Sequence, residues 1–254
     1  MSGGLPRIFL LSHMRAYTSL AGHILGSHPR ISGYFELHLS YEGPAALVRQ
    51  QAILEQEGAL KPEGRYLFDK LLHNEYRLLP ERLGDTCIRL LVSIAEPERT
   101  LKSILALFGR KSPHDPYASP EGAVGYYLER LEALAKFCEG APGHLYYDAE
   151  LFRAAPAMLL AGLSEWLELD PPLSERYQTF PRTGEARWGD SSSNIRSGRI
   201  LDRGGDYAHV HLPRHLLEQA RAVYLDCRQR MIESAARTLL LDHAPVTSAS
   251  RGQG

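Results

Sequence analysis

Residues 8–38, IFLLSHMRAYTSLAGHILGSHPRISGYFELH, decide the fold of this chain. Residues 8–12 open the stretch with a short, mainly apolar run that predicts a buried strand. A polar turn over 13–17 leads into apolar residues at helical spacing, which predict a helix over 18–25. A glycine and a proline just beyond this segment end the helix. A strand, a tight turn and a helix in this order begin an α/β unit.

The same alternation continues along the rest of the chain. Residues 87–94, CIRLLVSI, give the strongest strand signal, and 120–139 form a long helix with one apolar face. Further strands are expected at 65–68 and 144–147, and further helices at 45–60, 98–108, 151–169 and 213–241. We therefore predict an α/β fold with a central, mostly parallel sheet flanked by helices. We expect one domain over 1–242, with a polar loop at 178–203, and a disordered tail over 243–254.

Composition excludes several classes of protein. The chain has 254 residues, 44% of them apolar, and therefore can bury a core without disulfides. Lys and Arg number 29 against 30 Asp and Glu, which leaves no basic excess for binding nucleic acid. Three cysteines without a CxxC pair indicate a reducing compartment and no structural zinc, and His209 and His211 have no third metal ligand nearby.

The N-terminal apolar run holds only four residues, too few for a signal peptide or a membrane span. We therefore expect a cytoplasmic protein with no metal, no membrane partner and no nucleic-acid partner. The predicted helix at 213–241 is apolar enough to contribute to a homodimer.

Three polar segments accompany the predicted strands, at 13–19, 69–73 and 95–103. Because ligands of parallel α/β sheets bind beyond the carboxyl ends of the strands, we expect these segments to form one rim. The first segment predicts an anion site, since the N–H groups and dipole of a helix N-terminus attract negative charge. Arg15, Thr18 and Ser19 can add hydrogen bonds. The turn has no glycine and no GxxxxGK[ST] pattern, which argues against an ordinary NTPase. The alternative is that Thr18 only caps the helix.

The beginning of the chain resembles the sulfotransferase family. That family places a loop with a basic residue, Ser-Gly and two hydroxyl residues after its first strand, followed by a helix, an L-x-x-HP step and an acidic residue. Here Arg15 stands at the basic position, and Ala16 and Tyr17 replace Ser-Gly. The residues that match the rest of the pattern are Thr18, Ser19, Leu20, Leu25, His28, Pro29 and Glu36.

A second motif lies at 87–105, CIRLLVSIAEPERTLKSIL. It is similar to the family's strand followed by R-D-P-R-D-x-x-x-S, with Ser103 at the expected spacing. Ala95 occupies the position of the arginine that, in the family, holds the 3′-phosphate of the donor together with the serine. Arg99 and Lys102 are the candidates to replace that arginine. Weaker matches lie at 68–74, 146–169 and 188–200, so the resemblance covers most of the chain.

The resemblance implies a P-loop-NTPase-like three-layer fold and a sulfotransferase. The implied co-substrate is 3′-phosphoadenosine 5′-phosphosulfate (PAPS), whose sulfuryl group passes to a hydroxyl or amine of a small-molecule acceptor. The implied donor-binding residues are Arg15, Ala16, Tyr17, Thr18, Ser19, Ser103, Arg196, Ser197 and Arg199. The implied catalytic residues are Arg15, Glu36, His38 and Lys70.

Each catalytic candidate has a role that its chemistry permits. Arg15 stabilises charge on the leaving oxygen and is no general acid, because its pKa is above about 12. Glu36 is the first choice for the base that takes the acceptor proton. His38, on the same side of an extended segment, and His73 are alternatives, and either histidine can instead be a surface residue. Lys70 would bridge the donor sulfate and the acceptor.

Two other functions stay open at this point. One is a non-catalytic nucleotide- or anion-binding module on the same fold, suggested by Ala95 and the turn without glycine. The other is a sulfotransferase whose donor lacks the 3′-phosphate, again suggested by Ala95. An apolar acceptor pocket is expected near Tyr17, Tyr34, Phe35 and Tyr41, which cluster in the sequence.

Overall fold

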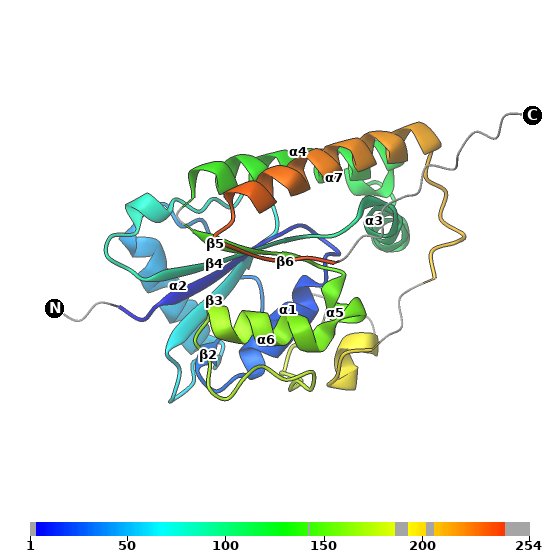
Figure 1. Cartoon of the computed structure of the whole chain (residues 1–254). Coiled ribbons are helices and arrows are strands. Elements are labelled where there is room, and N and C mark those ends of the chain that lie inside the picture. The colour runs from blue at the N-terminus through cyan, green and yellow to red at the C-terminus, as the bar shows by residue number, and fades with distance from the viewer. Residues whose placement is uncertain (1–3, 142, 186–192, 202–205, 242–254) are drawn as a thin grey trace, which may run out of the picture.

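The computed structural model describes residues 4–141, 143–185, 193–201 and 206–241, and a six-stranded sheet forms its centre (Figure 1). The strands are β1 (Arg7–Leu11), β2 (Ile31–Ser32), β3 (Tyr66–Leu71), β4 (Ile88–Ile94), β5 (His144–Asp148) and β6 (Arg237–Leu239). Their order is β2-β3-β1-β4-β5-β6, and every neighbouring pair is parallel. The expected α/β class with a parallel sheet is therefore confirmed. The strand order reverses beside β1, which places a ligand crevice at the carboxyl ends of β1 and β4.

Helices cover both faces of the sheet and give three layers (Figure 1). The α-helices are α1 (Thr18–Ser27), α2 (Pro44–Gln56), α3 (Pro97–Lys111), α4 (Pro120–Gly140), α5 (Leu151–Ala154), α6 (Pro156–Trp166) and α7 (Arg214–Ser234). Short 3-10 turns are η1 (Pro80–Arg82), η2 (Pro116–Ala118) and η3 (Ser193–Ser197). The core on one face joins α1, α5 and α6, and the core on the other joins α2, α3, α4 and α7.

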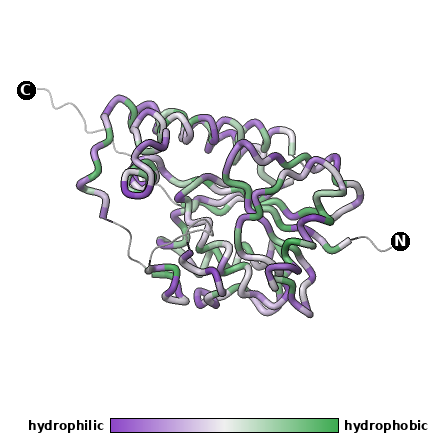
Figure 2. Tube along the Cα trace, turned by 180° about the vertical axis from the view of Figure 1, so that it is seen from behind, coloured by the Kyte–Doolittle hydropathy of each residue, from purple (hydrophilic) through white to green (hydrophobic). Residues whose placement is uncertain are grey.

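Strand β1 shows why the sheet lies in the middle. All five of its residues are buried. Because side chains alternate along a strand, Ile8 and Leu10 pack on the α1 side, and Phe9 and Leu11 pack on the opposite side. A strand covered on both faces therefore reads as an unbroken apolar run. Figure 2 shows this distribution, with hydrophobic colour concentrated along the strands between the helical layers.

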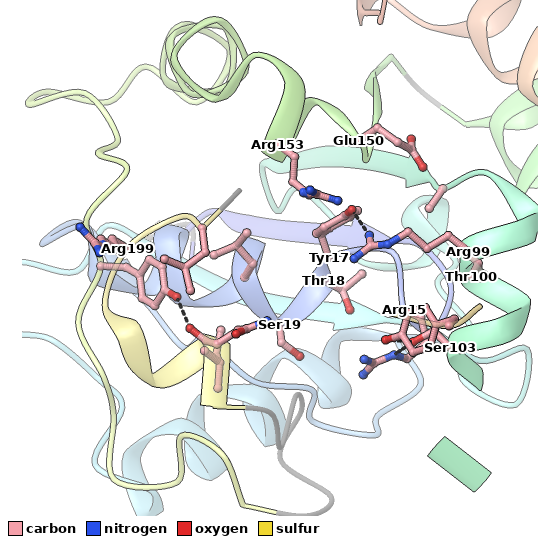
Figure 3. A pocket seen from close by; sticks show the side chains of 17 residues that line it. Arg15, Tyr17, Thr18, Ser19, Arg99, Thr100, Ser103, Glu150, Arg153 and Arg199 are labelled. Carbon is pink, nitrogen blue, oxygen red and sulfur yellow. Dashed lines mark hydrogen bonds between the residues drawn. The ribbon is translucent and has the colours of Figure 1, made fainter. Parts of the chain in front are cut away.

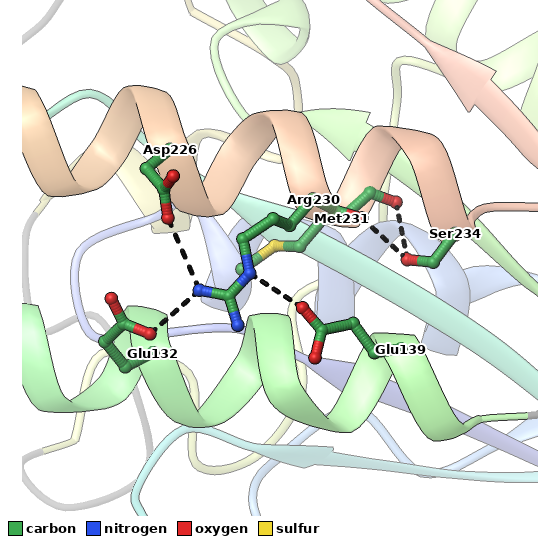
Figure 4. A network of polar contacts seen from close by, with 6 residues as sticks. All are labelled: Glu132, Glu139, Asp226, Arg230, Met231 and Ser234. Carbon is green, nitrogen blue, oxygen red and sulfur yellow. Dashed lines mark hydrogen bonds and ion pairs between the residues drawn. The ribbon is translucent and has the colours of Figure 1, made fainter.

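The long helices α4 and α7 lie side by side over one face of the sheet (Figure 1). Ala220, Tyr224, Cys227 and Met231 form the buried stripe of α7. At the surface of this helix pair, Arg230 of α7 reaches Glu132 and Glu139 of α4 at 2.9 and 2.7 Å (Figure 4). The apolar stripe that suggested a homodimer is therefore covered within the chain itself.

Two of the expected helix boundaries are wrong. The helix expected over 151–169 is broken between α5 and α6, where Pro156 begins a new helix because proline cannot donate the backbone hydrogen bond of a continuous one. The helix expected over 213–241 ends at Ser234, and β6 follows as an edge strand paired with β5. The expected tail at 243–254 lies outside the described residues. Within the described part of the chain, no helix combines the length and the apolar character needed to cross a membrane.

Candidate active site

The turn between β1 and α1 is built without glycine. Arg15 and Tyr17 adopt left-handed backbone conformations, with φ of 65° and 57°. Such a conformation costs about 1–2 kcal/mol in a residue with a Cβ atom. Tyr17 is the N-cap of α1, but its side chain makes no capping hydrogen bond, and the first turn of the helix has no acidic residue. The N-terminus of α1 thus keeps its positive dipole uncompensated by a local carboxylate.

A pocket lies in front of this helix N-terminus, at the carboxyl ends of the central strands (Figure 3). Its walls come from the turn before α1, the first turns of α1 and α3, the residues after β5 and the late loop. The charged residues among its described lining are Arg15, Arg99, Arg153, Arg199 and Glu150. Four guanidinium groups against one carboxyl group produce a positive potential that favours an anion with several charges. We call this cavity the arginine pocket.

Arg15 is fixed at one end of the arginine pocket by a chain of hydrogen bonds. Its Nε donates to Ser103 Oγ at 2.9 Å, and Ser103 Oγ donates to the Tyr207 hydroxyl at 2.9 Å. Burial alone would raise the pKa of Tyr207, but the Ser103 hydrogen bond and the charges of Arg15 and Arg99 outweigh it and lower that pKa. Ser103 and Arg15 therefore both hydrogen-bond to the oxygen of Tyr207, an arrangement of donors that suits an oxyanion. In Figure 3, Arg15 and Ser103 lie on the side of the pocket away from Arg199.

Arg99 brings a guanidinium group to the pocket that Ala95 also lines. Ala95 lines the arginine pocket, and Arg99, in the first turn of α3, lines it too. The Arg99 guanidinium donates to the Tyr17 hydroxyl and lies 5.3 Å from the centre of the Tyr17 ring. Lys102, the other candidate to replace the missing arginine, instead pairs with Glu98 at 2.9 Å. Of the two, Arg99 is therefore the residue that brings charge to this wall.

His13 joins the turn to the end of β4. The Ala95 N–H group donates to His13 Nε2 at 2.9 Å, so Nε2 carries no proton, and Nδ1 lies 2.8 Å from the Met14 carbonyl oxygen, to which it donates. The ring is fully buried, and burial lowers the pKa of His13 to about 4. A neutral histidine with both ring nitrogens engaged therefore fixes the position of the turn relative to Ala95.

Glu150 is the acidic member of the arginine pocket. It follows β5, and its Oε1 accepts a hydrogen bond from the Glu96 N–H group at 2.8 Å. Burial raises the pKa of Glu150 to about 7, and the charges of Asp148 and Glu96 act in the same direction. A carboxyl group with this pKa is partly protonated near neutral pH and so weakens the positive potential less than an ordinary glutamate would.

The three expected base candidates lie near one another, since Glu36 and His38 both act electrostatically on His73. His38 Nδ1 lies 3.9 Å from Glu36 Oε1. Burial lowers the pKa of His73, and the nearby charge of Glu36 opposes that shift. The Glu36 side chain is 12% exposed, and among the described residues its buried Oε1 has no hydrogen-bond partner. Such an atom needs an explanation, because buried polar groups are almost always paired.

Asp69 anchors the segment that carries Glu36. Its Oδ1 accepts from the Leu37 N–H group at 3.0 Å, and its Oδ2 accepts from the Tyr41 hydroxyl at 2.7 Å. Burial raises the pKa of Asp69 to about 7. The residue next to Glu36 is thus tied to β3, which fixes the Glu36 backbone relative to the sheet.

The other expected site residues are not all in the arginine pocket. Arg15, Tyr17, Thr18, Ser19, Ser103 and Arg199 line it. Ala16 is buried against Ala95 and Ala149. Arg196 and Ser197 are exposed and outside its lining. Lys70 lies within β3, is 2% exposed, and is outside the lining too. Lys70 was expected at the rim of the sheet, but it is a buried residue within strand β3.

The expected apolar acceptor pocket is packed core. Tyr34 stacks on Phe180 with ring centres 4.0 Å apart, and Tyr41 packs edge-on against Phe9 at 4.5 Å. Tyr34, Phe35 and Tyr41 are all buried, and only Tyr17 of the group lines the arginine pocket. Proximity in sequence was a poor guide, because these side chains point to the sheet and to α1.

Sequence reasoning missed Glu150, Arg153 and Tyr207 as pocket residues. The signal for Glu150 and Arg153 was available, since both follow the predicted strand at 144–147 and the carboxyl ends of parallel strands share one edge. Tyr207 carried no such signal, because its position depends on how the late loop crosses the sheet.

The fold and the arginine pocket place the chain in the class of parallel α/β proteins whose ligands bind at the carboxyl edge of the sheet, before the first helix. Neither the family models nor the curated proteins include a match to the chain. Among solved structures, the chain is similar to a sulfotransferase domain from the curacin biosynthetic pathway. The two share 17% sequence identity with a TM-score of 0.58, over 89% of this chain and 99% of that one. The chain therefore has a sulfotransferase fold.

Proposed function

We propose that this protein is a sulfotransferase that moves a sulfuryl group from PAPS to a hydroxyl or amine group of a small-molecule acceptor. The observation that carries the proposal is the pairing of two features. One is an arginine-rich pocket at the N-terminus of α1, and the other is the largely buried side chain of Glu36, whose Oε1 has no hydrogen-bond partner among the described residues. The sulfotransferase fold supports the same reaction class.

The arginine pocket suits a donor with two phosphate groups. The 5′-phosphosulfate fits the first turn of α1, where Thr18 and Ser19 line the pocket. The second phosphate fits the oxyanion geometry at Ser103, where Arg99 supplies the charge that Ala95 lacks. This arrangement favours PAPS over a donor without the 3′-phosphate.

The transfer itself needs a base and a stabilised leaving group. The acceptor oxygen attacks the donor sulfur, and the bond between sulfur and the bridging oxygen breaks, so that 3′-phosphoadenosine 5′-phosphate (PAP) leaves with both electrons of that bond. Glu36 takes the acceptor proton, a step worth about 10²–10⁴-fold in rate. Arg15 offsets the charge that develops on the departing phosphate. The unpartnered Glu36 oxygen favours this enzyme over a non-catalytic binding module.

A calorimetric comparison of two nucleotides tests the donor assignment. We expect PAP to bind about 100-fold more tightly than adenosine 5′-phosphate, because only PAP fills the Ser103 end of the pocket. In Arg99→Ala that ratio should fall about tenfold or more, since one hydrogen bond to a charged group contributes about 1.5–3 kcal/mol.

Arg110→Ala is the matched control for this experiment. Arg110 lies on the same helix, is exposed, and donates to the Ala106 carbonyl oxygen, away from the arginine pocket. We expect this variant to keep the wild-type ratio. Equal affinities of the wild-type protein for the two nucleotides would show instead that the donor has no 3′-phosphate. No binding of either would overturn the proposed function.

A further inference from the structure

A second hollow adjoins the same turn and carries different chemistry. Tyr126 connects the two sites: its hydroxyl accepts from the Met14 N–H group at 2.8 Å and donates to the Leu72 carbonyl oxygen at 2.9 Å. Tyr126 also lines the hollow, whereas Arg15, the residue after Met14, lines the arginine pocket. The Tyr126 side chain therefore links the wall of this hollow to the turn that carries Arg15.

This hollow, which we call the tyrosine groove, has a volume of about 400 Å³, within the range of small-molecule sites. The lining residues on which the argument rests are His73, Glu75, Tyr117, Gly125, Tyr126 and Glu129. The Tyr117 and Tyr126 rings lie 5.2 Å apart, and the His73 ring lies 5.6 Å from Tyr126. These three neighbouring rings are tilted relative to one another, by 57° and 48°, and offer ring faces and edges to an aromatic ligand.

The charge of the tyrosine groove is opposite to that of the arginine pocket. Glu75 and Glu129 line the groove, and none of its described lining residues is a lysine or arginine. Both carboxylates, together with Asp115, act electrostatically on the Tyr117 hydroxyl. The buried side chain of Arg130 donates to the Ser12 and Leu71 carbonyl oxygens and to Asn74 Oδ1. Its guanidinium group is therefore held by these three acceptors and is not part of the groove lining, although its charge acts on His73 and Tyr126.

The base candidates lie at the same place. His73 lines the groove, and Glu36 is close enough to act electrostatically on both His73 and Tyr126. A hydroxyl group bound beside His73 and Tyr126 would therefore lie within the electrostatic reach of Glu36, the proposed base.

We propose that the tyrosine groove binds the acceptor, and that the acceptor is a small aromatic alcohol or phenol with a protonated amine. This inference rests on the proposed sulfotransferase function. The ring packs on Tyr117 and Tyr126, and the ammonium group pairs with Glu75 and Glu129 and can lie over a tyrosine ring. The free hydroxyl is the nucleophile. An ammonium group has no lone pair for attack on sulfur, so it serves recognition only.

Three compounds of nearly the same shape test this assignment by calorimetry on the protein saturated with PAP. Tyramine carries an ammonium group, 4-ethylphenol is neutral, and 3-(4-hydroxyphenyl)propionate carries a carboxylate. We expect tyramine to bind about tenfold more tightly than 4-ethylphenol, and the propionate to bind most weakly. In Glu129→Gln the affinity for tyramine should fall several-fold, while the affinity for 4-ethylphenol stays unchanged.

A steric variant tests the location. A Cβ atom at Gly125 would have no heavy atom within 4 Å, so Gly125→Leu fills the groove without disturbing the packing. Gly109 of α3 is likewise a helical glycine with open space, but it lies outside the groove, and Gly109→Leu is the matched control. Both changes raise helix propensity, so both variants should fold. We expect Gly125→Leu to lose tyramine binding and to keep PAP binding, and Gly109→Leu to keep both.

Three results would overturn the inference: 4-ethylphenol binding as tightly as tyramine, Gly125→Leu binding tyramine like the wild-type protein, or none of the three compounds binding. A failure of PAP to bind would instead contradict the proposed function. Tyramine titrated into the unloaded protein would still test the groove in that case.

Discussion

At the scale of single residues, the site depends on a turn held in an unfavourable shape. Arg15 and Tyr17 have left-handed backbone conformations in a turn that contains no glycine. Side-chain contacts offset that cost: Ser103 accepts from Arg15, and Arg99 contacts the Tyr17 ring. The residues that would bind the donor are thus the same residues that hold the turn in place.

The motif match identified Arg15, Thr18, Ser19 and Ser103 as pocket residues, because each occupies a fixed place after a strand. It could not identify His13, whose importance lies in two hydrogen bonds to backbone groups of Met14 and Ala95. Such contacts depend on how close two strands lie in the folded sheet, and this distance cannot be deduced from the sequence of either strand.

His13 leads to a prediction about pH. Its pKa in the folded protein is about 4, against a usual value of 6.5, because the buried ring resists protonation. The unfolded chain therefore binds one more proton than the native protein between these pH values, and the native state loses stability as pH falls from about 6.5 to about 4. His13→Asn removes this titration, so the stability advantage of the wild-type protein over the variant should shrink by about 3 kcal/mol across that range.

Urea unfolding of both proteins at several pH values measures this difference, and other titrating groups cancel in the subtraction. A difference that stays constant between pH 6.5 and 4 would mean that His13 is not held neutral by the fold.

At the scale of elements, α7 is attached to the rest of the molecule by two very different arginines. Arg228 forms two hydrogen bonds to Asp148 of β5, at 2.7 and 2.6 Å, and the Asp148 side chain is 2% exposed. Arg230 lies two residues further along α7 and forms ion pairs with three acidic side chains on the surface of α4 and α7 (Figure 4). The hydrogen-bond distances of the two arginines are similar, but the acid that Arg228 contacts is buried and the acids that Arg230 contacts are exposed.

We expect Arg228→Ala to cost about 3–5 kcal/mol of unfolding free energy, because it leaves the Asp148 carboxylate buried without its ion-pair partner. Arg230→Ala should cost about 1 kcal/mol or less, since its partners stay solvated. Thermal unfolding measures both, and the first change should lower Tm by roughly 10 °C. Equal shifts for the two variants would contradict the assignment of the buried pair.

The elements that the sequence predicted well are those whose signal is local. The apolar run at 87–94 and the one-sided helix at 120–139 became β4 and α4 with nearly the expected ends. Strands β2 and β6 were missed because two and three residues carry no periodicity, and they are defined by pairing with β3 and β5. The position of Lys70 was predicted wrongly because β3 continues through the polar residues Asp69 and Lys70, beyond the apolar run that predicted the strand.

At the scale of the whole molecule, a chain with a net charge of −1 separates its charges between two neighbouring cavities. The arginine pocket gathers four guanidinium groups, and the tyrosine groove is lined by carboxylates. An anionic donor and a cationic acceptor would each be drawn to its own site, and each site would repel the other's ligand. Total composition hides this arrangement, because a net charge near zero says nothing about a local anion site.

The most direct test of the central claim is a crystal structure of the protein with PAP bound. We predict that the 5′-phosphate lies at the first turn of α1, within hydrogen-bond distance of Thr18 and Ser19. The 3′-phosphate should contact Ser103 and Arg99. A nucleotide bound elsewhere, or a 3′-phosphate that makes no contact with either residue, would contradict the account.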